Sequence, residues 1–76
     1  MQTIDFVLRG EYITLDALLK ATGLANSGGA AKVLIAGGEV RVNDEVDTRR
    51  GRKCRVGDEV VVGPVRVRVG GAEAAV

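Results

Sequence analysis

Apolar residues in the first half of the chain recur at intervals of three and four positions. They form two stripes of three residues each, namely Leu15, Leu18 and Leu19 in the first and Ala31, Leu34 and Ile35 in the second. This spacing puts each stripe on one face of a helix. Thr14 and Ser27 stand just before the stripes, where a side-chain hydroxyl can cap free backbone N–H groups. The pattern therefore predicts one helix over about 15–22 and another from 28 to the glycines at 37 and 38.

The remaining apolar residues alternate with polar ones at a period of two, which is typical of strands that bury one face. Strands are expected at 4–8, 39–42, from 46 onward, 59–62 and 65–69. Between two of them lies Asn43-Asp44, a turn dipeptide whose residues both tolerate positive φ. Arg66 and Arg68 fall on the outward face of the last strand, where they either extend a basic surface or protect a sheet edge.

Two short helices need a sheet to cover their apolar stripes. The expected fold is therefore α+β, with two short helices packed on a small, mostly antiparallel sheet. The 76 residues suffice for a single domain, 1–76, and a chain of this size buries only about 60% of its unfolded surface. The small, weakly patterned residues 70–76 predict a frayed tail.

Composition removes several classes of function. The chain has one cysteine and no histidine, so neither an intrachain disulfide nor a zinc site of Cys and His ligands can form, and no cofactor is expected. Cys54 lies between Lys53 and Arg55, which would favour a thiolate, but an ordinary small side chain in a turn or strand is the better expectation. No apolar run approaches the roughly 18 residues of a membrane span, and the first residues do not resemble a signal peptide, so none is expected. We therefore expect a cytoplasmic protein without membrane contact.

A cationic run occupies the loop expected after residue 46. Five of the seven residues from 49 to 55 are basic, with no acidic residue among them: Arg49, Arg50, Arg52, Lys53 and Arg55. The net charge is −3 over residues 1–48 and +4 over residues 49–76, so the overall +1 hides an asymmetry. Such a run is either a solvated turn or a site for a polyanion, and nucleic acid is the polyanion expected for a short chain.

Two other clusters contain residues that could bind an anion or act in catalysis. Ser27, Gly28 and Gly29 can present backbone N–H groups to an anion at a helix start, or can simply cap that helix. Carboxylates gather at Asp44, Glu45 and Asp47 and again at Asp58-Glu59. They are expected in turns or on exposed strand faces, where no apolar pocket would raise a carboxyl pKa for catalysis. We therefore expect neither an enzyme nor a small-molecule substrate.

The order of the elements, together with several residues, resembles the alpha-L RNA-binding motif family, the domain type of small-subunit ribosomal protein S-four. The matching positions, within about 12–62, are 15–20, Gly23-Leu24, Ser27, Ala31-Lys32, Leu34-Ile35, Gly38, 40–43, Val46, the basic run and Gly57-Asp58. Among members, the chain is most similar to small stand-alone YbcJ-like proteins. These share Ser-Gly at the second helix start, the stretch 48–55 and a short extra strand on either side, here 4–8 and 65–69.

The resemblance implies a non-catalytic module that binds structured ribosomal or transfer RNA, with the ribosome as a further partner. The residues expected at the RNA are Ser27, Gly28, Gly29, Lys32, Arg41, Arg49, Arg50, Arg52, Lys53 and Arg55. Members usually carry arginines at the positions of Thr14 and Gly28 and a glycine at that of Asp44, so these departures shift the contacts onto Lys32, Arg41 and the basic run. Because Phe6 and Tyr12 are the only aromatic residues, we expect recognition of RNA shape through phosphates rather than base stacking.

A protein-interaction adaptor that keeps the fold without binding RNA is the alternative. Its surface would be an open strand edge formed by Val65, Val67 and Val69 with Arg66 and Arg68, to which a partner adds a strand.

Overall fold

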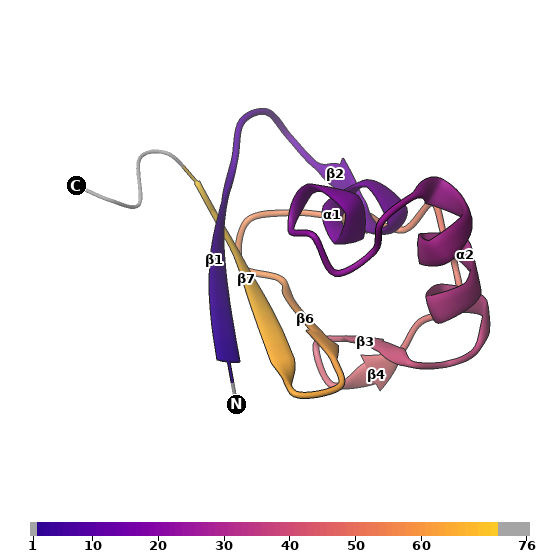
Figure 1. Cartoon of the computed structure of the whole chain (residues 1–76). Coiled ribbons are helices and arrows are strands. Elements are labelled where there is room, and N and C mark those ends of the chain that lie inside the picture. Colours follow the sequence, from indigo (N-terminus) through magenta and orange to yellow (C-terminus); the bar gives the residue numbers. More distant parts are fainter. Residues whose placement is uncertain (1, 72–76) are drawn as a thin grey trace.

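Alternating valines in the second half of the chain build one face of a five-stranded sheet. The computed structural model describes residues 2–71 and orders the strands β1-β7-β6-β3-β4 (Figure 1). Their bounds are β1 Gln2–Leu8, β3 Val40–Val42, β4 Glu45–Val46, β6 Glu59–Val62 and β7 Val65–Gly71. Neighbouring strands pair antiparallel except β1 and β7, which run parallel. The predicted mostly antiparallel sheet is confirmed.

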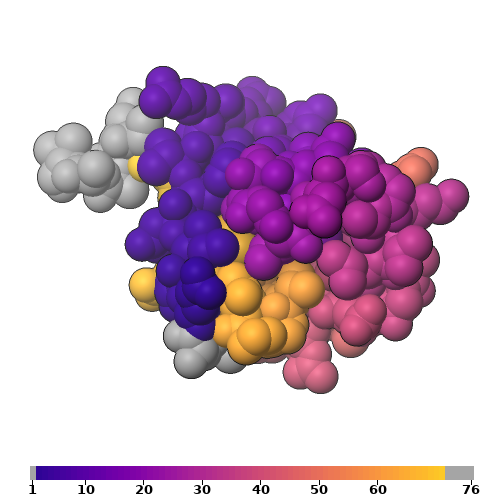
Figure 2. Space-filling view, in the orientation of Figure 1, coloured from indigo at the N-terminus to yellow at the C-terminus, as the bar shows by residue number. Residues whose placement is uncertain are grey.

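Two helices form a layer on this sheet, as the leucine and alanine stripes predict. In α1, Leu15–Ala21, the three leucines are fully buried. In α2, Gly28–Ala36, Ala31 and Ile35 are fully buried, and Leu34 is partly buried. Figure 2 shows that the side chains fill the space that the ribbons of Figure 1 leave open. Within residues 2–71, neither helix is long and apolar enough to cross a membrane.

The sheet meets the helices with a row of apolar side chains at one register. This row crosses four strands and consists of Ile4, Val67, Val60 and Val42. Val42, Val60 and Val67 are almost completely buried, and each such side chain stabilises the fold by about 1.5–3 kcal/mol relative to exposure. The residues next to this row point the other way: Arg41, Val61 and Arg66 line up on the opposite face of the sheet. Alternate positions along each strand therefore face the helices or face away from them.

The turns follow from their residues. Gly23 ends the α1 segment at a φ of +80°, a conformation that glycine adopts without steric cost. Asn43 and Asp44 join β3 to β4 at φ values of 52° and 71°. A two-residue turn with positive φ at both positions matches the right-handed twist of a hairpin, as expected for this dipeptide.

A two-stranded ribbon lies beside the main sheet, and the sequence pattern did not predict it. β2, Ile13–Thr14, pairs antiparallel with β5, Lys53–Cys54. Its inner side holds Cys54, which is fully buried, and Ile13, which packs against the core. Burial raises the pKa of the Cys54 thiol to about 11, so the thiolate favoured by neighbouring cations does not form. The basic run is therefore partly strand rather than all loop.

The C-terminal strand differs from two expectations. β7 lies between β1 and β6 and pairs with both, so Arg66 and Arg68 protect no sheet edge. For the same reason, the adaptor interpretation that uses Val65–Val69 as an open edge is wrong. The predicted tail begins two residues too early, because Gly70 and Gly71 still belong to β7, and residues 72–76 lie outside the described part of the chain.

Candidate nucleic-acid interface

The basic run is fastened to the start of α1 by its backbone. The N–H of Leu15 donates to the carbonyl oxygen of Arg52 at 2.8 Å, and the N–H of Asp16 donates to that of Arg50 at 3.2 Å. These carbonyls satisfy N–H groups that a helix start leaves without intrahelical partners. Thr14 occupies the cap position, but its hydroxyl accepts no capping hydrogen bond, so the capping role predicted for it is wrong.

A buried carboxylate holds two of the five cations. Asp47 is only 7% exposed, and its Oδ1 accepts hydrogen bonds from the backbone N–H and the Nε of Arg49 at 2.9 and 3.1 Å. Its Oδ2 accepts from Arg49 Nη2 at 2.8 Å and from Arg52 Nη1 at 3.0 Å. The Arg49 guanidinium, more than any other group, holds the pKa of Asp47 far below its usual range. The expectation of an exposed Asp47 is wrong, and the basic run has an internal counter-ion.

The far end of the run is held by a second polar contact. Asp58 Oδ2 accepts a hydrogen bond from the backbone N–H of Arg55 at 2.8 Å, and its Oδ1 accepts from Asn43 Nδ2 at 3.0 Å. Partial burial raises the pKa of Asp58, but these two hydrogen bonds and the positive charges of Arg52 and Arg55 together outweigh it, and the pKa is lowered. The hairpin turn at Asn43 therefore fixes the chain where the basic run ends.

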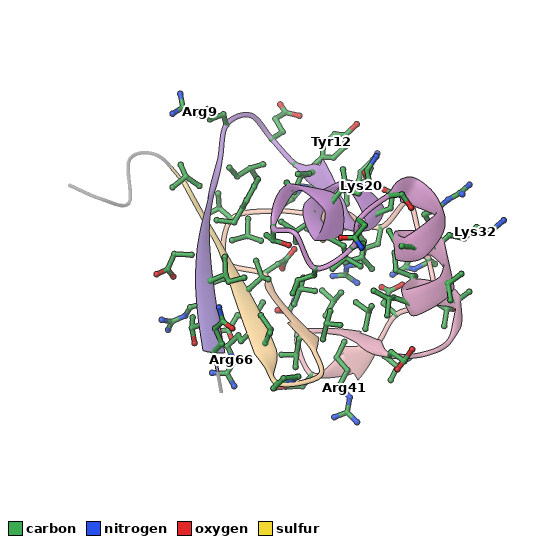
Figure 3. The ribbon with its side chains drawn as sticks, in the orientation of Figure 1. Arg9, Tyr12, Lys20, Lys32, Arg41 and Arg66 are labelled. Carbon is green, nitrogen blue, oxygen red and sulfur yellow. The ribbon has the colours of Figure 1, made fainter. Side chains whose placement is uncertain are left out.

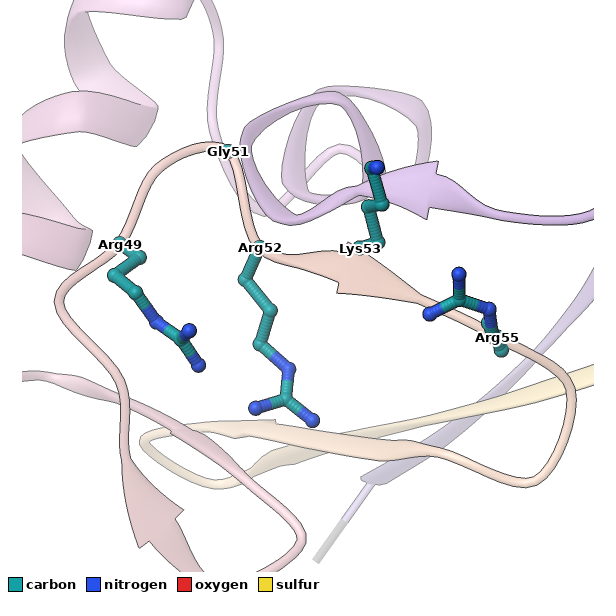
Figure 4. Close-up of a pocket in the computed structure, with 5 residues that line it drawn as sticks. All are labelled: Arg49, Gly51, Arg52, Lys53 and Arg55. Carbon is teal, nitrogen blue, oxygen red and sulfur yellow. The ribbon is translucent and has the colours of Figure 1, made fainter.

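The run encloses an open hollow of about 450 Å³. Its lining residues are Arg49, Gly51, Arg52, Lys53 and Arg55 (Figure 4). Figure 4 shows Arg49 and Arg52 pointing to one side of the chain and Lys53 pointing to the other. Arg50, Lys53 and Arg55 are exposed. Guanidinium and ammonium groups around an open hollow suit phosphate oxygens, which accept several charge-assisted hydrogen bonds at once.

Tyr12 adjoins the same cations and was not among the residues expected at the RNA. Its ring centroid lies 5.1 Å from Lys53 Nζ and 6.0 Å from Arg55 Cζ. The side chain projects from the start of β2 in Figure 3 and remains 44% exposed. The overlooked signal was the segment Tyr12-Ile13-Thr14, whose aromatic and β-branched residues favour a strand.

The other predicted site residues are spread over the surface. Ser27 caps α2, its Oγ accepting a hydrogen bond from the Ala30 N–H at 3.1 Å, while Gly28 and Gly29 are exposed at the helix start. Lys32 points outward from α2 in Figure 3. Arg41 alternates with two buried valines and points away from the helices, so the structure does not bring it together with the basic run. Anion binding at Ser27–Gly29 stays a prediction.

Comparison with known proteins identifies the class. The chain matches the S4 domain over residues 6–70 and belongs to this family, whose members typically bind RNA. The resemblance predicted from the sequence is confirmed. A relative from Bacillus subtilis (strain 168), "Probable ribosome maturation protein RlbA", is 52% identical over 52 residues, which cover 68% of this chain and 73% of the relative.

Proposed function

We propose that this chain is a non-catalytic module that binds structured ribosomal or transfer RNA and acts in ribosome maturation. The observation that carries the proposal is the group of cations held around the open hollow by Asp47, Asp58 and the first turn of α1. Membership in the S4 domain family supports RNA as the ligand. The name of the Bacillus relative supports a role in ribosome maturation.

The five cations divide into two sets with different tasks. Arg50, Lys53 and Arg55 make no ion pair within residues 2–71 and contact RNA phosphates directly. Arg49 and Arg52 are held by Asp47, which orients them while it offsets part of their charge. Three free phosphate contacts correspond to a slope of log Kobs against log salt of about −2 to −3, at roughly 0.7–0.9 per contact.

The N-terminal end of α2 forms a second part of the proposed surface. Gly28 and Gly29 present backbone N–H groups at the positive end of the helix, and Lys32 adds a charge one turn further on. Arg41 has no part in this surface because it lies on the other face of the sheet.

A binding titration tests the proposal. Nuclease-treated protein is titrated with structured ribosomal RNA fragments at several salt concentrations, with duplex DNA of equal length for comparison. Arg50→Ala combined with Arg55→Ala should weaken binding to all RNAs alike and make the salt slope shallower by about 2. Arg66→Ala combined with Arg68→Ala removes the same charge from the open face of the sheet and should leave RNA binding unchanged.

The proposal fails if the wild-type protein does not bind RNA at low salt. It also fails if both double variants lose affinity equally, because net charge rather than the described surface would then explain binding. A protein partner that survives nuclease treatment and high salt would instead support an adaptor role.

A further inference from the structure

Tyr12 lies on the outward face of the β2–β5 ribbon together with two cations. The register pairs Ile13 with Cys54 and Thr14 with Lys53. Continued by one position, the same register places Tyr12 opposite Arg55. Because side chains alternate along strands, Tyr12, Lys53 and Arg55 share one face, while Ile13 and Cys54 face the core. We call this outward face, formed by Tyr12, Lys53 and Arg55, the aromatic-basic face.

The Tyr12 ring is contacted by two cations but is still partly exposed to solvent. Lys53 Nζ and Arg55 Cζ lie within cation–π distance of the ring centroid, at 5.1 and 6.0 Å. Close cations restrict the orientations of an exposed aromatic side chain, and 44% of Tyr12 still faces solvent. The only other aromatic residue, Phe6, packs against the core, so a stacking contact on this molecule has one available ring.

An exposed tyrosine alone is common on protein surfaces and would carry no inference. Here the ring adjoins Lys53 and Arg55, two cations that we propose bind phosphate, so the three side chains offer a partner for a base and partners for its phosphate. A base stacks on an aromatic face, and its phosphate pairs with a neighbouring cation. An aromatic ring beside two cations suits an unpaired nucleotide, because a base within a duplex is already stacked on its neighbours and cannot stack on the ring.

We propose that Tyr12 is the stacking platform for one unpaired base, whose phosphate is bound by Lys53 and Arg55. The inference rests on the RNA-binding function proposed above and narrows its ligand. The preferred RNA is a stem carrying a bulged or junction nucleotide, with the paired stem lying along the basic run. The expectation that this chain recognises RNA without base stacking is replaced by one stacking contact within a mainly phosphate-based interface.

The test compares two RNA stems that differ by one nucleotide. One is fully paired, and the other carries a single bulged 2-aminopurine, a fluorescent base whose emission falls when it stacks. Wild-type protein should bind the bulged stem about tenfold more tightly and quench its fluorescence. Tyr12→Phe keeps the ring and should preserve both effects. Tyr12→Leu keeps an apolar side chain but removes the ring, and should abolish both effects, so that this variant binds the two stems with equal affinity.

Each outcome decides between the two proposals. If Tyr12→Leu retains the preference and the quenching, the stacking inference is overturned while RNA binding stands. A preference of the wild type for the paired stem overturns it as well. If the wild type binds neither stem, both proposals fall. Far-UV circular dichroism of Tyr12→Leu establishes that the variant is folded, and a third stem with an abasic bulge separates base stacking from recognition of a bent backbone.

Discussion

Asp47 accepts hydrogen bonds from three donors of Arg49 and one of Arg52. In the sequence it looks like one of several acidic residues in a turn, and no local pattern distinguishes it from Asp44 or Glu45. The difference arises because the chain folds back after β4 and buries this carboxylate beneath the guanidinium groups that follow it. The position of the cations was therefore readable from sequence, but the anion that orients two of them was not.

The pKa of Asp47 leads to a prediction about acid stability. The pKa is lower in the folded chain than its unfolded value of about 4, so ionised Asp47 stabilises the fold at neutral pH. That stabilisation is lost progressively as the pH falls below about 4 toward the folded pKa. Asp47→Asn should lower the free energy of unfolding at pH 7 by about 1–3 kcal/mol.

Urea unfolding of wild type and Asp47→Asn, followed by circular dichroism from pH 7 down to about pH 2.5, checks this prediction. The difference in free energy of unfolding between the two proteins should become smaller in acid, because only the wild type loses the contribution of ionised Asp47. A difference that stays constant over this range would show that the ionised carboxylate has no special role in stability.

At the scale of elements, the sequence was a good guide wherever periodicity extended over several residues. Both helices and the strands of the main sheet were expected at nearly their observed positions. The β2–β5 ribbon was missed because each of its strands has two residues, too few to show a period of two. The role of Tyr12 was missed for the same reason, because only the pairing of β2 with β5 brings it beside residues more than 40 positions away in the chain.

The β3–β4 turn supports a prediction about a single backbone position. Asp44 has a φ of 71°, a left-handed conformation that costs most non-glycine residues about 1 kcal/mol or more. Asp44→Gly should raise the free energy of unfolding by up to about 1 kcal/mol, whereas Asp44→Ala should lower it by a similar amount. Both variants remove the same charge, so the difference between their urea midpoints isolates the backbone effect. Equal midpoints would contradict the conformational explanation.

At the scale of the whole molecule, the proposed RNA surface is continuous with the core. The carbonyls of Arg50 and Arg52 cap α1, and Cys54 inserts among the buried side chains. RNA bound to the basic run should therefore stabilise the entire domain rather than the run alone. At free RNA of about 100 times the Kd, amides that exchange only by global unfolding should slow about 100-fold.

Hydrogen–deuterium exchange measures this effect for each segment. Slowing should extend to α1 and the central strands and should disappear at high salt. The Arg50→Ala and Arg55→Ala double variant should show little slowing under the same conditions. Protection confined to residues 49–55 would mean that the basic run binds RNA without coupling to the fold.

The parallel pairing of β1 with β7 has a consequence for how the protein is made. Gln2 pairs in register with Val65, so β1 cannot pair until β7, the last of the described strands, has been synthesised. The hydrogen bonds within the helices and within the β3–β4 hairpin are local and can form while synthesis continues. Until β7 is released, β1 exposes both of its edges and its apolar face. The sheet of a chain proposed to help mature ribosomes is thus completed only after its last described strand, β7, has left the ribosome.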